Sequence, residues 1–339
     1  MAVTIKEIAE KSGVSRGTVD RVLNHRGNVS EETEKIITKV AEELGYRPNI
    51  AGKALAARKK KFNIGVILCS DGNEFFDEVL HGIHRAEAEA TDYGVSVLLR
   101  TTKGYDVEKQ LRLIEELKPC IHFLILNAIH DNRIIKKISE LVDGGIQVIT
   151  VNTDVEFGKR LCHVGADYHK SGETAGGMMG LLTNGNAKVL ITTGYKRVLA
   201  HNQRIEGFTK IIKERYPKIE VVDIIETEDD KETAYNNTKN SLKKHPDITA
   251  IYIVAAGAVG VCLAIEECQR EDILVIACDC TKSMEKLIEK GIVKATICQQ
   301  PFTQGYKSLQ TAVQYLVNGT NPYKDVYAMK NEIKIYENM

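Results

Sequence analysis

Apolar residues in the first part of the chain recur every three or four positions in three successive segments, as in amphipathic helices that share one core. Gly13 interrupts the pattern between the first two segments and is free to adopt a positive φ in a tight turn. Ser15 and Ser30 stand where N-caps of the second and third segments are expected. The pattern predicts three short helices, whose inward positions are Ile5, Ile8 and Ala9, then Val19, Val22 and Leu23, and then Ile36, Ile37, Val40 and Leu44.

From residue 62 onward the pattern changes to short apolar runs that alternate with amphipathic helical stretches. Strands are predicted at residues 63–68, 95–99, 123–127, 147–151, 188–192, 221–225, 250–254, 274–278 and 295–298. Such alternation indicates parallel, doubly wound α/β sheets, and the number of strands favours two lobes over one. Ligands of these sheets bind outside the carboxyl ends of the strands, so polar residues directly after strands are the candidates for a binding site.

The first three predicted helices follow the plan of a helix-turn-helix domain, with a three-residue turn between the first two. In that plan the outward face of the second helix enters the major groove of DNA. Arg16 could donate to the two acceptors of guanine, and Arg21 could contact a base or a phosphate. Gly17 permits a close approach of the backbone. The alternative is a small helical bundle whose solvated face has no DNA partner.

Composition and charge narrow the class of protein. The chain has 339 residues, is 43% hydrophobic and has a formal net charge of zero, which favours two or three globular domains over a disordered chain. The charge is unevenly spread, because residues 1–61 contain 13 Lys and Arg against 8 Asp and Glu. A basic head on an acidic body indicates a polyanion-binding module attached to a second function.

The chain shows no signal for membrane insertion or export. It contains no apolar run of the roughly 18 residues that a transmembrane helix needs. Lys6, Glu7, Glu10 and Lys11 occupy the positions where a secretory peptide needs an apolar core. We therefore expect a cytoplasmic protein, associated with the nucleoid, that has no membrane partner.

Three common enzyme motifs are absent: the Gly-x-x-x-x-Gly-Lys-Ser/Thr phosphate loop, Gly-x-Gly-x-x-Gly after a strand, and the Gly-x-Ser-x-Gly elbow. The eight cysteines form no Cys-x-x-Cys pair, and most fall in apolar runs, as buried reduced thiols do. We expect no catalytic residue, no metal site, no cofactor and no enzymatic activity.

Polar and aromatic residues gather directly after the predicted strands. Amides, carboxylates and a guanidinium can hydrogen-bond several hydroxyl groups of a ligand, while phenylalanine rings pack against the C–H face of a sugar. A buried polar group that a wrong ligand leaves unpaired costs about 1–3 kcal/mol. The candidate ligand site is formed by Asn73, Phe75, Phe76, Asn127, Asn152, Asp154, Arg204, Asp279 and Gln299. For any one of these residues, the alternative is local capping or a turn.

Residues 3–24, VTIKEIAEKSGVSRGTVDRVLN, and residues 29–49 with their GYRPN ending resemble the head of the LacI family of bacterial transcription regulators. Asp20 departs from the family, which usually has Ser there, and a carboxylate repels phosphate although it can accept from cytosine N4. The resemblance implies binding to double-stranded operator DNA through Thr4, Ser15, Arg16, Gly17, Thr18, Asp20, Arg21, Asn24, Asn49, Ala51 and Leu55.

Residues 49–57 form a short candidate helix between head and body. Isolated helices below about 12–15 residues are marginal in water, and Gly52 costs a helix roughly 1 kcal/mol relative to Ala. The resemblance implies that this segment is the family's hinge helix, which orders on DNA, pairs with its dimer mate and inserts Leu55 into the minor groove. From the residues alone, a plain linker is the alternative.

Residues 65–322 resemble the type I periplasmic sugar-binding fold, especially its ribose-binding branch. Asn-x-Phe-Phe at residues 73–76 and Arg-x-x-Gly-Phe at residues 204–208 carry the resemblance. It implies that the candidate ligand site holds a sugar-like effector between two lobes. The chain departs from the branch at Asn152-Thr153, which replaces Asp-Arg, at Ala255-Ala256, which replaces Asn-Asp, and at Cys278, which replaces an aromatic residue. These changes favour an effector that is larger, less hydroxylated or differently charged than ribose.

We therefore predict an all-α DNA-binding head at residues 1–48, a hinge helix and linker at 49–61, and a two-lobed α/β body at 62–339. The lobes, each a doubly wound parallel sheet, are expected at residues 62–160 with 293–322, and at 161–292 with 323–339. No leucine heptads occur in residues 323–339, so we expect a homodimer.

The leading hypothesis is a repressor whose affinity for a pseudo-palindromic operator is controlled by the effector. The alternative is a sugar-binding sensor or carrier without a role in gene control. A location outside the cytoplasm would favour that alternative.

Overall fold

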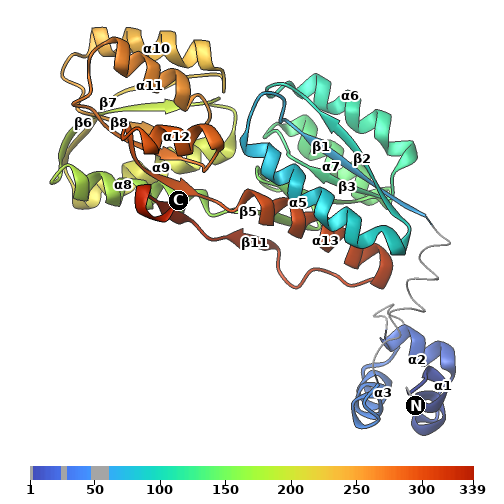
Figure 1. Cartoon of the computed structure of the whole chain (residues 1–339). Helices are drawn as coiled ribbons and strands as arrows, with labels where there is room; N and C mark the ends of the chain where they lie inside the picture. Colours follow the sequence, from blue (N-terminus) through green and yellow to red (C-terminus); the bar gives the residue numbers. More distant parts are fainter. Residues whose placement is uncertain (1–2, 24–28, 47–60) are drawn as a thin grey trace.

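The computed structural model describes residues 3–23, 29–46 and 61–339. The first two ranges contain α1 (Ile5–Ser12), α2 (Arg16–Leu23) and α3 (Glu31–Glu43) (Figure 1). Ile8, Val19 and Ile37 are fully buried in the core that these helices share. The predicted three-helix head is confirmed, whereas the predicted hinge helix at residues 49–57 lies outside the described residues.

Short polar side chains and one glycine set the turn between α1 and α2. Thr4 and Glu7 form a reciprocal capping box at the start of α1. The Ser15 hydroxyl accepts a hydrogen bond from the Thr18 amide at 3.1 Å, which fixes the start of α2. Gly13 follows α1 with a φ of 70°, a left-handed conformation that residues with side chains rarely adopt.

The first lobe of the body is a six-stranded parallel sheet with helices on both faces (Figure 1). Its strand order is β11-β5-β4-β3-β1-β2. The strands are β1 (Phe62–Leu68), β2 (Val95–Thr101), β3 (Phe123–Leu126), β4 (Gln147–Val151), β5 (Cys162–Ala166) and β11 (Val326–Met329). One face packs on α5 (Phe75–Ala90) and α13 (Pro301–Asn318), and the other on α6 (Val107–Leu117) and α7 (Asn132–Asp143).

The second lobe repeats this plan with the strand order β12-β10-β9-β8-β6-β7. Its strands are β6 (Asn186–Thr193), β7 (Lys218–Glu226), β8 (Ala250–Ile253), β9 (Leu274–Cys278), β10 (Val293–Cys298) and the antiparallel edge strand β12 (Glu332–Lys334). Helices α8 (Tyr168–Leu182) and α9 (Leu199–Arg215) cover one face. The other face packs on α10 (Lys231–Lys244), α11 (Ala258–Glu267) and α12 (Lys282–Glu289).

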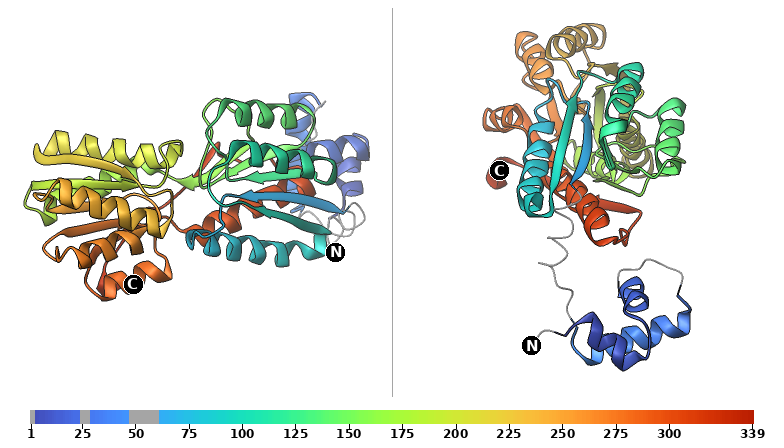
Figure 2. Two further views of the ribbon diagram at one scale, coloured as in Figure 1. Left: turned by 90° about the horizontal axis from the view of Figure 1, so that it is seen from above. Right: turned by 90° about the vertical axis from the view of Figure 1, so that its right-hand side faces the viewer.

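The chain passes between the lobes three times, and this corrects the expected lobe boundaries. The passages follow β5, follow β10, and join β11 to β12, and the two lobes lie side by side in Figure 1 and in the left view of Figure 2. Residues 162–166 and 326–329 belong to the first sheet, whereas residues 293–298 belong to the second. Each of the three passages begins at the carboxyl end of a strand of one lobe and leads to the next helix or strand, which belongs to the other lobe.

Two glycines bring α8 and α9 into close contact and thereby position the buried end of α9. A Cβ at Gly172 would lie 2.0 Å from the Arg204 carbonyl oxygen, and one at Gly207 would lie 2.1 Å from the His169 carbonyl oxygen. Only glycine allows backbones to approach so closely. The resulting helix pair holds Arg204 against the carboxyl ends of the second sheet.

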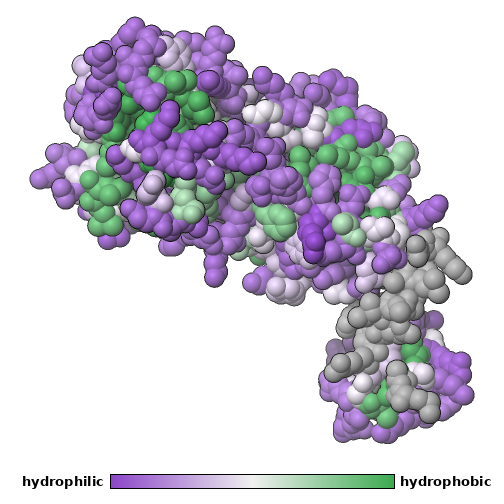
Figure 3. All heavy atoms as spheres, in the orientation of Figure 1, coloured by the Kyte–Doolittle hydropathy of each residue, from purple (hydrophilic) through white to green (hydrophobic). Residues whose placement is uncertain are grey.

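No helix in the described ranges is long and apolar enough to cross a bilayer. The face of the molecule seen in Figure 3 is mainly hydrophilic, and apolar residues form separate patches on the two lobes.

Candidate functional site

The exposed face of α2 carries the basic residues predicted to contact DNA. Ser15, Arg16, Gly17 and Arg21 are exposed, whereas Thr18 and Asp20 are half-buried. Val19 and Val22 on the same helix are buried in the head core. The helix therefore presents both arginines outward on a rigid support, as readout of a DNA groove requires.

Gly17 has no packing role in the isolated head. A Cβ at this position would meet only the Ser15 hydroxyl oxygen, at 3.7 Å, which is an ordinary contact. A glycine on the exposed face is therefore available for a close approach by a partner. Thr4 is exposed but its side chain caps α1. The predicted DNA contacts Asn24, Asn49, Ala51 and Leu55 lie outside the described residues.

In the body, loops from both lobes enclose a cavity of about 200 Å³. The first lobe contributes residues 72–75, which follow β1. The second lobe contributes residues that follow β7, β8 and β9, among them Asp229, Ala255 and Asp279. The cavity thus lies at the carboxyl ends of parallel strands, where α/β sheets bind ligands.

Arg204, Asp279 and Gln299 form one polar cluster beside this cavity. The Arg204 side chain is 3% exposed and donates from Nη1 to the Val254 carbonyl oxygen at 2.5 Å and from Nη2 to Asp279 Oδ1 at 3.4 Å. Gln299 Nε2 donates to the same Asp279 oxygen at 2.5 Å. Burial alone would lower the pKa of Arg204, but the neighbouring Cys278 and Asp279 raise it, so the guanidinium remains charged.

Asn127 and Asn152, which directly follow β3 and β4, form a second polar cluster, in the first lobe. Asn127 Nδ2 donates to Asn152 Oδ1 at 3.3 Å and to Thr153 Oγ1 at 2.9 Å, and Asn127 Oδ1 accepts from the Cys69 amide. Tyr168 links this cluster to the Arg204 cluster. Its hydroxyl contacts Asn152, and its ring lies 5.2 Å from the Arg204 guanidinium carbon. Two of the four predicted side-chain amides, Asn127 and Asn152, are thus bonded to each other, which orients them but leaves them few free donors.

Of the two predicted phenylalanines, one lines the cavity and the other is packed in the core. Phe75 lines the cavity at the start of α5, and Asn73 Oδ1 accepts from its backbone amide at 3.1 Å. Phe76 is 1% exposed and packs in the core of the first lobe. The two rings meet edge to face with centroids 5.2 Å apart, so Phe76 supports Phe75 rather than facing the cavity.

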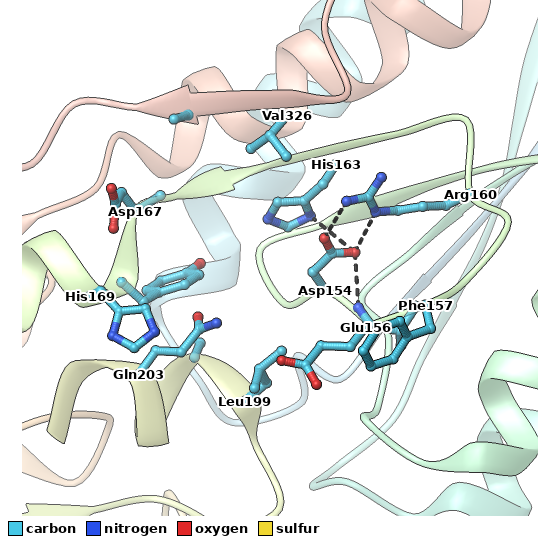
Figure 4. Close-up of a pocket in the computed structure, with 15 residues that line it drawn as sticks. Asp154, Glu156, Phe157, Arg160, His163, Asp167, His169, Leu199, Gln203 and Val326 are labelled. Carbon is cyan, nitrogen blue, oxygen red and sulfur yellow. Dashed lines mark hydrogen bonds and ion pairs between the residues drawn. The ribbon is translucent and has the colours of Figure 1, made fainter. Parts of the chain in front are cut away.

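Asp154 lies apart from the other predicted residues, in a groove of about 540 Å³ between β5, β11 and α9 (Figure 4). Arg160 donates to both of its carboxylate oxygens at 2.7 Å, and the Thr150 hydroxyl donates to Oδ1 at 2.7 Å. Burial would raise the pKa of Asp154, but the Arg160 hydrogen bonds and the nearby His163 lower it. Its polar contacts hold the loop after β4, and it does not share a cavity with Asp279.

Further residues, which were not among the predicted site residues, line the cavity or connect the two lobes beside it. Asp229 lies in the loop between β7 and α10, where no site residue was predicted although the loop follows a strand. Glu74 stands beside Asn73 and faces Ser283 of α12. Tyr105 of the first lobe and Tyr195 of the second meet with ring centroids 5.3 Å apart. These contacts join the two lobes across the cleft.

The described residues contain no group of three or more His, Cys, Asp or Glu side chains placed to hold a metal ion. All eight cysteines are free thiols.

Comparisons with known proteins place both parts of the chain. Residues 4–49 match the family model described as bacterial regulatory proteins, lacI family, and residues 64–320 match a periplasmic binding protein domain. The catabolite control protein A of Priestia megaterium is 26% identical over 75% of this chain and 74% of its own length. The ribose operon repressor of Halalkalibacterium halodurans is 28% identical over 76% and 74%. The regulator RegA of Clostridium saccharobutylicum is 37% identical, but the match spans only 34% of its length.

Relatives of the body alone include binding proteins. The ribose import binding protein RbsB of Bacillus subtilis is 28% identical over 83% of this chain and 90% of its own length. GanP, a glucose-galactose binding protein from Geobacillus stearothermophilus, superposes with a TM-score of 0.76 at 24% identity and covers 82% of this chain and 98% of GanP. The latter likeness shows the fold.

The head and the two-lobed body together define a DNA-binding transcription regulator whose body binds a small effector. The chain belongs to the LacI family of bacterial regulatory proteins and carries a periplasmic binding protein domain.

Proposed function

We propose that this protein represses transcription as a homodimer on a pseudo-palindromic operator, and that a sugar-like effector in the cleft between the lobes controls its affinity for that operator. The observation that carries the proposal is that one chain contains both a basic DNA-binding surface and a ligand cavity. The head exposes Arg16 and Arg21 on α2, and Asp279, held by Arg204, faces an interlobe cavity.

On the DNA side, we assign direct readout to the exposed start of α2. Arg16 is placed for bidentate donation to guanine, and Gly17 lets the backbone approach the groove. Residues predicted from the family, including those of the hinge, complete the interface: Thr4, Ser15, Thr18, Asp20, Arg21, Asn24, Asn49, Ala51 and Leu55.

On the effector side, we assign direct contact to Asn73, Phe75 and Asp279, which line the cavity. Arg204 and Gln299 orient Asp279, and Asn127 and Asn152 organise the first-lobe wall. The names of the ribose operon repressor and the ribose import binding protein support a sugar-like effector. The relatives are regulators and binding proteins, which supports a role without catalysis.

Control requires only a modest coupling between cleft and head. Effector binding stabilises one arrangement of the lobes, and the three passages of the chain between them transmit the change to the N-terminal end of β1. Couplings of about 1–3 kcal/mol are typical of allosteric proteins and change affinity about 5- to 150-fold.

The test begins with selection of bound sequences from random DNA by the full-length protein. We expect a two-fold symmetric consensus. A thermal-shift screen of pentoses, hexoses, inositols, amino sugars, sugar acids, sugar phosphates and purines then identifies effectors, because saturating ligand stabilises the folded state by RT ln(1 + [L]/Kd).

Two variants locate the effector site. Asp279→Asn should abolish the thermal shift and the effector's influence on DNA binding, whereas Asp143→Asn, on the exposed end of α7, should leave both unchanged. A protein with no sequence preference, with or without metabolites, would contradict the regulator function. A dimer mass in sedimentation velocity supports the homodimer, and a monomer on operator DNA contradicts it.

A further inference from the structure

Asp229 is held in the cleft by a tightly bonded loop. The loop follows β7, and its backbone amides at Thr227 and Glu228 donate to the Thr193 and Gly194 carbonyl oxygens at 2.7 and 3.0 Å. The Thr227 hydroxyl donates to the Ala256 carbonyl oxygen at 3.1 Å. Glu228 and Asp229 both have left-handed backbones, with φ of 54° and 52°. Two successive non-glycine residues in this region mark a conformation that the surroundings enforce, as is common at functional sites.

Asp229 is half-buried, and one of its carboxylate oxygens is unsatisfied. Asp229 lines the interlobe cavity, and its Oδ1 is inaccessible to solvent without a hydrogen-bond partner in the described part of the chain. A Cβ at Gly194 would lie only 2.2 Å from this oxygen, so the glycine makes room for the carboxylate. Buried polar atoms are almost always paired, and an unpaired ionised group is especially unfavourable. A group that enters the cavity, either a water molecule or a ligand, can supply the missing donor.

The charges around the cavity indicate what kind of donor it is. Asp229, Asp279 and Glu74 line the cavity, whereas Lys231 is the one cationic side chain in its lining among the described residues. Arg204 offsets Asp279, with which it forms an ion pair. Glu74 is bonded to Ser283 at the mouth. The negative charge of Asp229 is left without an ion pair in the described residues, in a site that Asp279 makes still less favourable for an anion.

We propose that the effector carries a protonated amino group on a polyhydroxylated small molecule, as an amino sugar or amino cyclitol does, and that Asp229 binds this ammonium. The inference rests on the proposed function, because it concerns the same cleft. A hydroxyl group would supply the missing hydrogen bond but would leave the carboxylate charge beside Asp279 uncompensated. An ammonium supplies both, and charge-assisted hydrogen bonds are about twice as strong as neutral ones. The hydroxyl groups of the ligand would meet Asp279 and Asn73.

The test compares matched ligands on the full-length protein by calorimetric titration near neutral pH. The probes are glucosamine, galactosamine, mannosamine and amino-deoxy-inositol, each with its neutral hydroxyl parent and its N-acetyl derivative. At least one amine should bind, and its neutral counterparts should bind at least tenfold more weakly. Asp229→Asn should lower the affinity for that amine at least tenfold. Asn tolerates a left-handed backbone, so this variant keeps the loop conformation. Glu228→Gln, which removes the same charge one residue away, should not change the affinity.

Two results would overturn the inference. One is tight binding of a neutral or anionic probe that Asp229→Asn leaves unchanged. The other is silence from every amine up to millimolar concentration. Either result is distinct from failure of the proposed function, which is judged by the operator selection and by the wider effector panel. A neutral sugar that releases the protein from its operator would support the regulator function and exclude the ammonium.

Discussion

The carboxylate of Glu74 in the first lobe accepts hydrogen bonds from both the backbone amide, at 3.1 Å, and the hydroxyl of Ser283 in the second lobe. Ser283 belongs to the first turn of α12, where backbone amides are unpaired and the helix dipole favours a negative charge. Partial burial would raise the pKa of Glu74, but the hydrogen bonds from Ser283 lower it. A side chain of one lobe thus caps a helix of the other and joins the two lobes across the cleft.

Weakening this contact should shift the lobes toward an open arrangement. A hydrogen bond of this kind contributes about 1 kcal/mol, so Glu74→Gln should weaken effector binding roughly fivefold. Ser283→Ala removes the hydroxyl hydrogen bond but keeps the backbone one, so it should weaken binding by no more than Glu74→Gln does. The double variant should lose less than the sum of the two single losses, because both changes affect the same contact. Titration calorimetry measures the affinity, and small-angle scattering measures the radius of gyration. Glu78→Gln serves as the control, because Glu78 lies in the first turn of α5 and is paired with His81 of its own lobe. Additive losses in the double variant would argue against one shared contact.

Asp229 should reduce the stability of the unliganded protein, and most strongly at pH values above its folded-state pKa. Burial, and then the negative charge of Asp279, raises the pKa of Asp229 to about 6, while Arg204 acts in the opposite direction. Burial and the charge of Asp229 also raise the pKa of Tyr105 and Tyr195, so both tyrosines stay protonated. A carboxyl whose pKa is raised on folding destabilises the native state as pH rises above its unfolded pKa of about 3.9, and the penalty is complete above about 6.

Asp229→Asn should therefore raise the free energy of unfolding at neutral pH by about 1–3 kcal/mol. The gain should shrink as pH falls from about 6 to 4. Urea unfolding at several pH values measures it, with Glu228→Gln as the matched variant. A variant that is less stable than the parent by the same amount at every pH would show that Asp229 has only a packing role.

His201 should make the body sensitive to acid. Its imidazole is 7% exposed, and its Nδ1 accepts from the Tyr195 amide at 3.3 Å, which requires that nitrogen to be unprotonated. Burial, and then the charge of Arg204, lowers the pKa of His201 to about 3. A histidine that must stay neutral in the folded state costs stability as pH falls below its unfolded pKa of about 6.5.

We expect this histidine to account for about 2–3 kcal/mol of lost stability between pH 6.5 and roughly 4.5. His201→Gln should flatten the fall in Tm over that window, even if the variant starts from a lower Tm. His169→Gln, at an exposed histidine, should leave the slope unchanged. Equal slopes for all three proteins would assign the acid sensitivity to other groups.

Periodicity predicted the fold well because most elements bury one continuous apolar face. All nine predicted strands are present. The strands that it missed carry weak patterns for physical reasons. β5 is fully buried, but His163 and Gly165 interrupt its apolar run. β12 has three residues and one apolar side chain, and it is held by pairing with β10 rather than by burial. Missing β5 also displaced the expected lobe boundary.

The site was harder to predict than the fold, because position after a strand does not tell which way a side chain turns. Asp279 and Phe75 line the cavity, but Asp154 turns toward Arg160, a partner six residues further along the chain. Asp229 follows a strand as Asp279 does. Gly194 makes room for the unpaired Oδ1 of Asp229, and the charge of Asp279 raises the pKa of the Asp229 carboxyl. Both residues are distant in the sequence, so only folding brings them next to Asp229.

Arg16 should determine base preference rather than overall affinity for DNA. It is exposed near the start of α2, and loss of a bidentate contact to guanine costs about 1–3 kcal/mol at one base pair. Arg16→Ala should therefore relax the selected consensus at one position of each half-site and weaken binding to other sequences much less. Selection from random DNA, followed by fluorescence anisotropy on single-base variants, measures this, with Lys39→Ala on the exposed face of α3 as the control. Equal weakening on every sequence, with a smaller salt dependence, would make Arg16 a phosphate contact instead.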